Sequence, residues 1–578
     1  MTIDHWVASL LAPLAIWVLI NGFDDLFIDF AALYGHIRQS SPSEEQLDAA
    51  PPRRMAIFVA LWKEHRVIRQ MLENNVSRMR YEPVEFFIGA YPNDAPTLGA
   101  IREAMAQFPN VHLSVCPHPG PTSKADCLNW IYQRMLLHEE QNGFRFDMIL
   151  THDAEDLIDP DALRWINYYA QWNDFVQIPV LALPTPIREL SHGVYCDEFA
   201  EYQYKDMVAR QVLGGFIPSN GVGTGFSRKA LEMLAAHYSN RIFEPACLTE
   251  DYENGFRVRR LGLPQKFMPI YFHQGRPIAT REYFPRQLAA AVRQRSRWVT
   301  GITLQSWEFH SVAETLQHGY WFWRDRKSLV SNLVTPLTNI LFFYGGATWA
   351  WAAWSHNPWG LAHETGPEYG IGLALQAFHT GIRMGCSARI YGFRFACAVP
   401  IRVVVGNWIN CFATCRAIWT YTRTKLRGEH LRWVKTTHAY PKKRLGEILV
   451  ENCFLSREHL EIALASQPEG IRLGEHLLRR GMISERHLCE ALARQNNLSA
   501  GKPDPETVSV PVTRALPAAM ARKWKVLPFR IAAGEIHLVG TDPPGEEMQK
   551  DIARFSSLEV RVQLVTPAEF EELANQYL

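Results

Sequence analysis

Two motifs near the middle of the chain carry side chains whose types and spacing could catalyse a group transfer. The first contains Glu250 and Asp251. The second, about forty residues later, contains Gln294, Arg297 and Trp298 at helical spacings of three and four, so these three share one helix face. A carboxylate can take a proton from an alcohol, while guanidinium and indole groups hold an anionic leaving group. Either motif alone would more often be an acidic turn or a basic helix. Together they predict glycosyl transfer from a nucleotide sugar.

The region upstream of these motifs alternates between short apolar runs and helical segments, which predicts an α/β domain. Apolar runs bounded by turn residues predict buried strands at 55–62, 84–91, 111–115 and 148–152. In open α/β sheets, ligands bind beyond the carboxyl ends of the strands. The polar residues that follow these strands are therefore candidates for a nucleotide site: Glu64, Asp94, Lys124, Asp126, Asp153, Glu155 and Asp156. Taken singly, Asp94 could be a turn former and Asp156 a helix cap.

The order of these motifs, over roughly 250 residues, resembles that of the family-2, membrane-bound processive glycosyltransferases, the group that contains cellulose and hyaluronan synthases. The resemblance implies a GT-A nucleotide-binding domain at residues 51–310 and an inverting transfer from a nucleotide sugar, with a UDP-linked donor. It implies that Asp251, with Glu250 beside it, is the general base. It also implies that Gln294, Arg297 and Trp298 act at the catalytic centre, the last two on the leaving diphosphate. The loop at 218–226 resembles the one that lines the acceptor channel in this family.

The same resemblance implies roles for the donor-binding and metal-binding residues. The residues implied to bind the donor are Glu64, Asp94, Lys124, Asp126, Asp153 and Arg295. Asp153 matches the first acid of the family's metal-binding Asp-x-Asp motif. The third position is Glu155 and the next is Asp156, so either of these could complete the metal site. Carboxylate ligands suit Mg²⁺ or Mn²⁺ that bridges to a diphosphate.

Two long uncharged stretches, at 6–23 and 329–354, predict helices that cross a lipid bilayer. A cleaved signal peptide is the alternative for the first stretch. Basic residues follow the first stretch, so the positive-inside rule places the transferase domain in the cytoplasm. We therefore expect an N-terminal transmembrane helix and lead-in at 1–50 and transmembrane and interfacial helices at 311–425. The expected location is a bacterial inner membrane, with several crossings and with the C-terminal part also in the cytoplasm.

The C-terminal part contains two copies of a 24-residue unit, at 444–467 and 472–495, with twelve identical positions. The pattern predicts paired short helices capped by Ser456 and Ser484. It resembles the MshEN domain of type II secretion ATPases, in which such tandem units bind cyclic di-GMP. The residues implied to bind this ligand are Arg444, Leu445, Gly446, Leu449, Leu460, Leu464, Gln467, Arg472, Leu473, Gly474, Leu477, Leu488, Leu492 and Gln495. The leucines could instead form the core of a helical docking module.

We expect the MshEN tandem-repeat domain at 440–500 and a small α/β subdomain at 501–578, with strands at 526–531 and 535–539. The net charge of +1 argues against a protein that coats nucleic acid. The order of membrane helix, transferase, membrane helices and repeat resembles that of the bacterial phage-adsorption protein B family.

The resemblance implies a transferase that extends a surface polysaccharide, is activated by cyclic di-GMP and works with an outer-membrane or periplasmic export partner. The alternative is a catalytically idle scaffold that senses cyclic di-GMP and supports an outer-membrane phage receptor.

Overall fold

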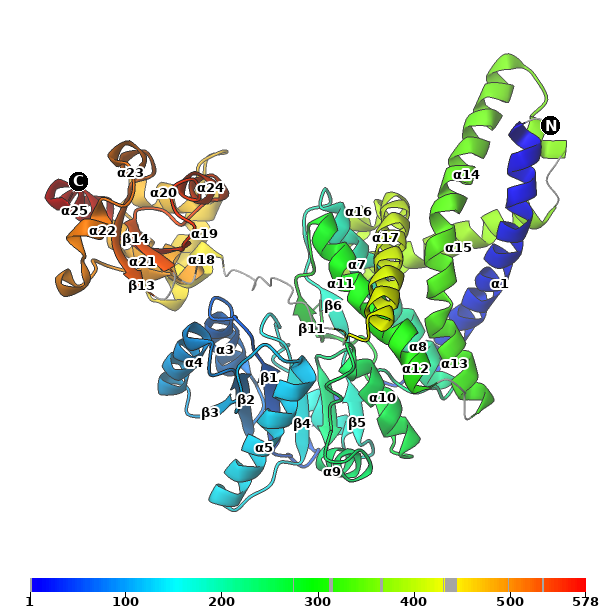
Figure 1. Ribbon diagram of the computed structural model, residues 1–578, viewed down its shortest axis with the longest axis horizontal. Coiled ribbons are helices and arrows are strands. Elements are labelled where there is room, and N and C mark those ends of the chain that lie inside the picture. The colour runs from blue at the N-terminus through cyan, green and yellow to red at the C-terminus, as the bar shows by residue number, and fades with distance from the viewer. Residues whose placement is uncertain are drawn as a thin grey trace. The chain divides into compact units, whose positions relative to one another are not determined.

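The computed structural model describes residues 3–577, except 274, 311–314, 364–366, 430, 432–443, 497 and 533–534. The chain forms two compact units, Met1–Tyr440 and Pro441–Leu578, which are described separately (Figure 1). The first unit contains the segments predicted as N-terminal helix, GT-A domain and membrane helices. The second unit contains both predicted C-terminal segments, the helical repeat at 440–500 and the α/β subdomain at 501–578.

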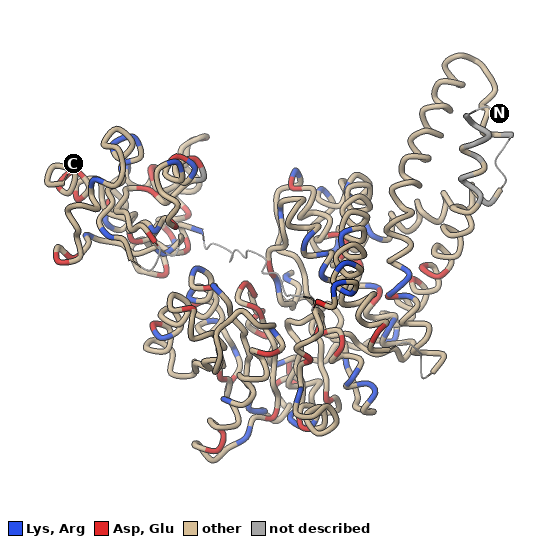
Figure 2. The backbone as a smooth tube through the Cα atoms, viewed as in Figure 1, with Lys and Arg blue, Asp and Glu red and all other residues tan. Residues whose placement is uncertain are grey.

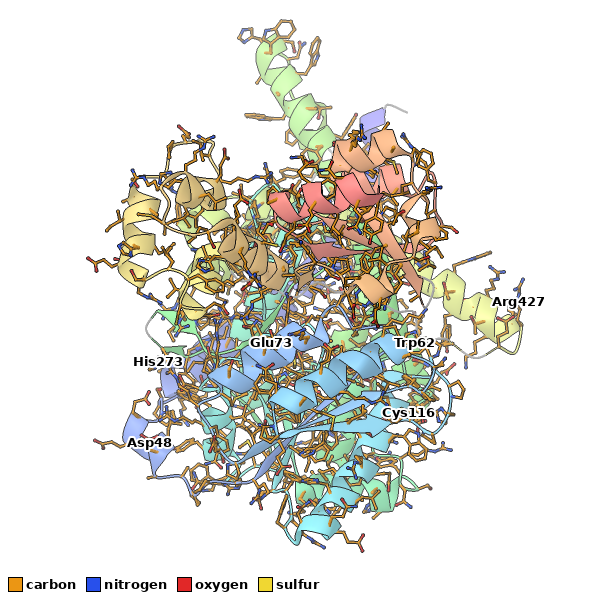
Figure 3. All side chains as sticks on the ribbon, turned by 90° about the vertical axis from the view of Figure 1, so that its left-hand side faces the viewer. Asp48, Trp62, Glu73, Cys116, His273 and Arg427 are labelled. Carbon is orange, nitrogen blue, oxygen red and sulfur yellow. The ribbon has the colours of Figure 1, made fainter. Side chains whose placement is uncertain are left out.

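A seven-stranded sheet forms the centre of the first unit, with the strand order β3-β2-β1-β4-β7-β5-β8. The four predicted strands are confirmed as a parallel set: β1 (Met55–Ala60), β2 (Val84–Ala90), β3 (Val111–Val115) and β4 (Met148–His152). The sheet continues through β7 (Thr224–Ser227), which is antiparallel to β4 and β5 (Phe175–Gln177), and ends at β8 (Gln265–Phe267). The carboxyl ends of the parallel strands share one edge. Trp62, after β1, and Cys116, after β3, mark that edge in Figure 3.

Helices cover both faces of this sheet because its strands are apolar on both sides (Figure 1). Ile57 and Val59 of β1 pack in one core with α3 (Ile68–Arg78), α4 (Ala95–Gln107) and α6 (Ala162–Tyr169). Phe58, between them, packs in a second core with α5 (Lys124–Asn142) and α9 (Arg228–His237). Burial of both faces explains why the strands are continuous apolar runs in the sequence.

Shorter elements complete the sheet region and carry the two central motifs. The acidic motif begins α10 (Glu250–Arg260), and the second motif ends α11 (Leu288–Trp298), which continues into the π-helical segment η2 (Val299–Gln305) and α12 (Ser306–Phe309). The remaining elements are α2 (Glu44–Asp48), β6 (Val180–Ala182), α7 (Leu190–Glu201), the π-helical η1 (Tyr202–Asp206), α8 (Met207–Val212), β9 (Phe272–His273), β10 (Arg276–Pro277) and β11 (Thr280–Glu282).

Long helices make up the rest of this unit: α1 (Ile3–Arg38), α14 (Ser328–Ser355), α15 (Pro367–Tyr391) and α17 (Val399–Leu426), with the shorter α13 (Leu316–Arg326) and α16 (Phe393–Ala396). Among the described residues, no helix combines the length and the mean hydropathy of a membrane span, so the predicted crossings are not found. Composition explains the difference for α14. This helix carries no charge (Figure 2), but its asparagine, threonine, glycine and tryptophan residues lower its mean hydropathy.

Ion pairs fasten α1 and α17 to their neighbours. Asp24 of α1 pairs with Lys327 at 2.7 Å, and Asp29 pairs with Lys205 at 3.2 Å. Arg402 of α17 is fully buried, and its Nε donates to Oδ2 of Asp197 in α7 at 2.5 Å. α17 also packs along α11 and η2. The segment at 311–425 is therefore integrated with the transferase part of the unit.

The second unit begins with the predicted helix pairs, α18 (Leu445–Glu451) with α19 (Arg457–Ala465) and α20 (Leu473–Arg479) with α21 (Glu485–Gln495). Ser456 and Ser484 cap α19 and α21 as predicted, because each hydroxyl accepts a hydrogen bond from the backbone N–H three residues ahead, at 3.2 and 3.1 Å.

A four-stranded sheet follows, in the order β12-β15-β14-β13, and confirms the two predicted strands. Its strands are β12 (Ser499–Ala500), β13 (Val526–Ala532), β14 (Glu535–Gly540) and β15 (Glu559–Leu564), and its helices are α22 (Val510–Thr513), α23 (Ala518–Trp524), α24 (Glu546–Ile552) and α25 (Pro567–Tyr577). Ala493 of α21 shares a core with Leu538 and Leu564 of the sheet. The segments predicted as separate domains at 440–500 and 501–578 therefore form one body.

Candidate active site

A cavity lies at the carboxyl edge of the seven-stranded sheet, and most of the predicted site residues line it. The walls come from segments far apart in the sequence: the ends of β1 and β4, the first turn of α5, the start of α10 and one face of α11. The predicted residues that line this donor cavity are Glu64, Lys124, Asp153, Glu155, Glu250, Asp251, Gln294, Arg297 and Trp298. The fold thus brings both central motifs and the upstream acids into one place.

Lys124 supplies a positive charge at the base of the cavity. Its Nζ lies 2.5 Å from Asp153 Oδ1 and 3.5 Å from the carbonyl oxygen of Gly221, to which it donates a hydrogen bond. Burial alone would lower the pKa of this lysine, but Asp153 and Glu250 raise it above its ordinary value. The side chain therefore stays charged and connects the acidic end of β4 with the loop beside Asp251.

Glu250 and Asp251 form the opposite wall at the start of α10. The backbone N–H of Tyr252 donates to Asp251 Oδ1 at 2.8 Å. Gly221, with a φ of 79°, lies so close that a Cβ at this position would be 2.6 Å from Asp251 Oδ2. Burial raises the pKa of Asp251, and burial together with the charge of Asp251 raises the pKa of Glu250 to about 7. The pair can therefore exchange a proton near neutral pH, as a general base requires.

The predicted face of α11 points into the cavity. In the described structure, the buried Oε1 of Gln294 and the buried Nε of Arg297 have no hydrogen-bond partner. Buried polar atoms are nearly always paired, so unpaired ones in a cavity wall indicate contact with a ligand. Trp298 packs on Tyr195 and Phe284, with ring centroids 6.0 and 6.3 Å away, and this packing fixes its indole as a wall.

A close contact joins the two motifs. Gly301 in η2 lies against Thr249, which precedes the two carboxylates, and a Cβ on Gly301 would be 2.6 Å from Thr249 Cγ2. Only glycine allows the segment after α11 to approach the start of α10 this closely. The carboxylates and the α11 face are therefore held in one relative geometry.

Arg295 does not line the cavity, and the prediction that it binds the donor is not supported. Its Nη1 donates to Glu198 Oε2 and to Asn410 Oδ1, both at 2.6 Å, and its guanidinium lies over the ring of Tyr195. Successive residues of an α-helix point about 100° apart. When Gln294 faces the cavity, the next residue therefore faces α7 and α17.

Asp156 is also turned away from the cavity. Its Oδ2 accepts a hydrogen bond from the backbone N–H of Asp153 at 2.9 Å and lies 2.8 Å from Nδ1 of His152. Burial lowers the pKa of His152 to about 3 and raises that of Asp156, so the imidazole is neutral and the two side chains share one hydrogen bond. Of the two alternatives for the second metal ligand, Glu155 lines the cavity beside Asp153 and Asp156 does not.

Asp94 and Asp126 lie next to the cavity rather than in its wall. Asp94 caps α4 by accepting from the backbone N–H of Thr97 at 3.5 Å, and it accepts from the backbone N–H of Lys63 at 2.6 Å. It therefore holds the segment after β1, and it acts as a helix cap rather than only as the turn former that was the alternative prediction. Asp126 accepts from the hydroxyl of Thr122 at 2.7 Å and lines an adjoining cavity.

Several cavity residues were not among the predicted ones, including Trp62, Tyr91 and Glu282, whereas Asn220 belongs to the predicted loop at 218–226. The rings of Trp62 and Tyr91 meet edge to face with centroids 5.4 Å apart and give the cavity an aromatic wall. Their position at the ends of predicted strands was the signal that could have found them. The buried Nδ2 of Asn220 has no hydrogen-bond partner among the described residues. No local sequence pattern predicts that Glu282 lines the cavity, because its strand, β11, has only three residues.

In the second unit, packing accounts for several residues that were predicted to bind cyclic di-GMP. Leu449 and Leu477 are fully buried in the core of the repeat. Gly446 and Gly474 each lie against the leucine fourteen residues ahead, and a Cβ on either glycine would be 2.7 Å from that leucine's Cδ1. These four residues close the helix pairs and do not present a surface to a ligand.

The other predicted residues of the repeat are more accessible. Arg444 and Arg472 are exposed, and the side chain of Leu464 is 51% exposed. Gln467 donates from Nε2 to the carbonyl oxygen of Ile471 at 2.6 Å. The leucines that lie partly buried against the two cores are Leu445, Leu460, Leu473, Leu488 and Leu492. Gln495 ends α21.

The two units match different known families. Residues 51–301 match the family described as glycosyltransferase like family 2, and residues 497–578 match the MshEN domain. The MshEN match falls on the α/β part of the second unit, whereas the domain was predicted at 440–500.

Comparison with individual proteins identifies relatives of the whole chain. It is 34% identical over 569 residues to bacteriophage adsorption protein B of Escherichia coli strain K12, an alignment that covers 92% of this chain and 76% of that protein. Over 137 residues it is 32% identical to the type IV pilus assembly ATPase PilB of Thermus thermophilus, covering 22% of this chain and 14% of PilB. Among solved structures, the mannosyltransferase PcManGT from Pyrobaculum calidifontis, in complex with GDP-Man and Mn²⁺, has a TM-score of 0.43 and 14% identity, covering 72% of this chain and 99% of that one. Because of its 34% identity to bacteriophage adsorption protein B over 92% of its length, the chain belongs to the bacteriophage adsorption protein B family, and it contains a family-2 glycosyltransferase domain and an MshEN domain.

Proposed function

We propose that this protein is an inverting glycosyltransferase that moves a sugar from a UDP-linked donor to a growing surface polysaccharide. The observation that carries the proposal is the convergence of three chemically distinct groups in one cavity: the Lys124 and Asp153 pair, the carboxylates of α10 and the polar face of α11. The unpaired buried atoms of Gln294 and Arg297 support a ligand in this place.

Each wall of the cavity has a role in this reaction. Asp251 takes the proton of the acceptor hydroxyl, because its Oδ2 faces Gly221 in the loop that resembles the family's acceptor channel. Arg297 and Gln294 hold the leaving diphosphate, and Trp298 closes the cavity beside them. The acceptor oxygen attacks the sugar from the side opposite the diphosphate, and this attack inverts the anomeric centre.

A Mg²⁺ or Mn²⁺ ion fits the carboxylates of Asp153 and Glu155, which line the same part of the cavity. When bound, the ion would neutralise charge on the diphosphate and make it a better leaving group. His152 and Asp156 lie behind these ligands and hold the backbone of Asp153 through the 2.9 Å hydrogen bond. Lys124 adds the positive charge that the ion pair with Asp153 keeps in place.

Cyclic di-GMP bound to the second unit activates the transferase. The MshEN match at residues 497–578 supports this part of the proposal. Arg444 and Arg472 open the two copies at equivalent exposed positions, and arginine suits both phosphate and guanine edges. Activation requires that the ligand has a higher affinity for the active state than for the inactive state.

The transferase works at the bacterial inner membrane, with the glycosyltransferase domain and the C-terminal unit on the cytoplasmic side. Large apolar side chains that are exposed along α14 support contact with lipid, among them Phe342, Phe343, Trp349, Trp351 and Trp354, which are 58 to 74% exposed. The relatives are named for bacteriophage adsorption, a process at the bacterial surface, and this supports a product that is passed to an export partner in the periplasm or outer membrane.

A donor assay tests the proposal. The purified full-length protein is incubated with UDP-sugars and, separately, GDP-sugars in Mg²⁺ or Mn²⁺, and released nucleoside diphosphate is measured with and without cyclic di-GMP. We expect release from a UDP-sugar and a higher rate with cyclic di-GMP. If no donor is consumed while calorimetry shows that cyclic di-GMP binds, the protein is an idle, ligand-sensing scaffold and the enzymatic proposal is wrong.

A further inference from the structure

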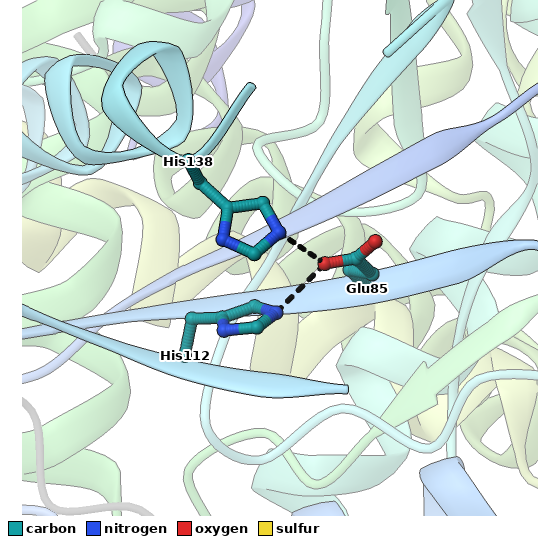
Figure 4. Close-up of side chains that lie close together, drawn as sticks. All are labelled: Glu85, His112 and His138. Atoms are coloured by element: carbon teal, nitrogen blue, oxygen red, sulfur yellow. Dashed lines mark hydrogen bonds and ion pairs between the residues drawn. The ribbon is translucent and has the colours of Figure 1, made fainter. Parts of the chain in front are cut away.

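A second group of metal-ligating side chains lies outside the donor cavity. Within the described residues, Glu85, His112 and His138 bring one ligand atom each to within 4.8 Å of one another (Figure 4). The Nε2 atoms of His112 and His138 lie 2.7 and 2.9 Å from the same oxygen, Glu85 Oε2. The two imidazole rings also pack on each other, with centroids 4.3 Å apart.

Three different elements supply this cluster, at the amino-terminal edge of the sheet. Glu85 is the second residue of β2, His112 the second of β3, and His138 lies in the last turns of α5. Lys124 begins α5, fourteen residues before His138, so the helix separates these two side chains by about 21 Å. The cluster is therefore distinct from the site proposed for the sugar donor.

The ligand types match a different metal from the one suited to the donor cavity. Two imidazoles and one carboxylate suit Zn²⁺ and related transition metals, whereas carboxylates alone suit Mg²⁺ and Mn²⁺. Tetrahedral zinc, with bonds of about 2.0 to 2.1 Å, holds neighbouring ligand atoms about 3.3 Å apart, so each Nε2 has to move from Oε2 by only about half an ångström. The three side chains are 13 to 16% exposed, which leaves room for a water molecule as fourth ligand.

The surroundings of the cluster leave one oxygen of Glu85 available for a metal. Arg54 lies 3.6 Å from the other carboxylate oxygen, Oε1, and leaves Oε2 to the two imidazoles.

We propose that Glu85, His112 and His138 bind one divalent transition-metal ion, best matched by Zn²⁺, that ties α5 to the edge strand β3 and to its neighbour β2. The ion would take the place of the two hydrogen bonds to Glu85 Oε2, and each imidazole would bind it through Nε2 with its proton on Nδ1. Since the site joins three elements of the folded chain, bound metal stabilises the first unit.

Zinc titration by calorimetry tests the proposal in the full-length, chelator-treated protein. The titrations use the Asp153→Asn background, because zinc could also occupy the carboxylates of the donor cavity. We expect one Zn²⁺ per chain in this background, and an affinity at least about 100-fold weaker after an added His138→Ala. His273→Ala is the matched control, since His273 is also paired with a carboxylate, Glu44, at 3.7 Å but has no second histidine in its pair.

A spectroscopic measurement distinguishes the loss of a metal ligand from unfolding of the protein. Co²⁺ in the Asp153→Asn protein should give the visible absorption of a site with two nitrogen ligands, and the nearly isosteric Glu85→Gln should abolish it while circular dichroism stays unchanged. Zinc should raise the melting temperature of Asp153→Asn and not that of Asp153→Asn/Glu85→Gln. No bound zinc in Asp153→Asn, or equal affinity with and without Glu85, would show that the cluster is a metal-free hydrogen-bonded group.

Discussion

In the donor cavity, residues from many separate segments meet and leave polar atoms without partners, whereas in the helical repeat the matching residues within each copy pack against one another. Gln294 and Arg297 offer unpaired buried atoms to the cavity. Leu477 is fully buried, and Gly474 is in contact with Leu488. The repeated leucine and glycine positions of the second unit therefore build a core, while the ordered motifs of the first unit line a cavity. Variants that change only one of these two properties test the difference.

The largest effect is expected for the carboxylate that faces the glycine-rich loop. Asp251→Asn keeps the size of the side chain and removes the base, so turnover should fall about 10²- to 10⁴-fold while donor affinity stays the same. Initial rates and donor calorimetry check this. The control is Asp48→Asn, whose side chain is 71% exposed and pairs with Arg164. Unchanged turnover in Asp251→Asn would show that Asp251 is not the general base.

A pair of leucines in the repeat tests the core. Leu477→Ala should lower the free energy of unfolding of the second unit by about 2 to 5 kcal/mol, because Leu477 is fully buried. Leu464→Ala, at a side chain that is 51% exposed, should change it by less than about 0.5 kcal/mol. Denaturant unfolding of the isolated second unit, residues 441–578, measures both, because its single tryptophan lies in α23. Equal effects would contradict the assignment of Leu477 to the core.

Gly221 provides a test of the contact between the loop and the base. Gly221→Ala places a Cβ 2.6 Å from Asp251 Oδ2 and should reduce turnover roughly 10-fold or more by displacing this carboxylate. Gly262→Ala is the matched control, because Gly262 has a φ of 73° but nothing within 4 Å of a new Cβ. Both variants bear the same backbone strain. A similar loss of turnover in both would assign the effect to strain alone.

The smallest effect concerns the pH profile. Burial raises the pKa of both carboxyls of α10, with that of Glu250 at about 7, so kcat/KM should fall as the pH drops below about 7 and the pair gains a proton. Glu250→Gln removes the negative neighbour, so Asp251 releases its proton at a lower pH and the acidic limb should move down by roughly one unit. Glu103→Gln, at a side chain that is 70% exposed, should leave the limb unchanged. An upward shift in Glu250→Gln would contradict the coupling.

Features set by a few neighbouring residues were predictable from the sequence. The strands β1 to β4 follow from apolar runs, the caps of α19 and α21 from serine, and the cavity face of α11 from the spacing of Gln294, Arg297 and Trp298. Features set by distant partners were not. Arg295 turns to Glu198, a partner that lies 97 residues away in the sequence. Asp156 turns to His152, only four residues away, and the loop conformation that brings them together has no sequence pattern. Likewise, nothing in the repeat itself shows that Ala493 shares a core with the sheet.

The contact between Gly301 and Thr249 has a mechanical consequence. This contact holds α10 against η2, and α17 packs along both α11 and η2, so these helices form one side of the cavity. The sheet forms the other side, where Lys124 and Asp153 lie. A displacement of α17 would therefore move Asp251 and Arg297 together, and KM for the donor and kcat would change together.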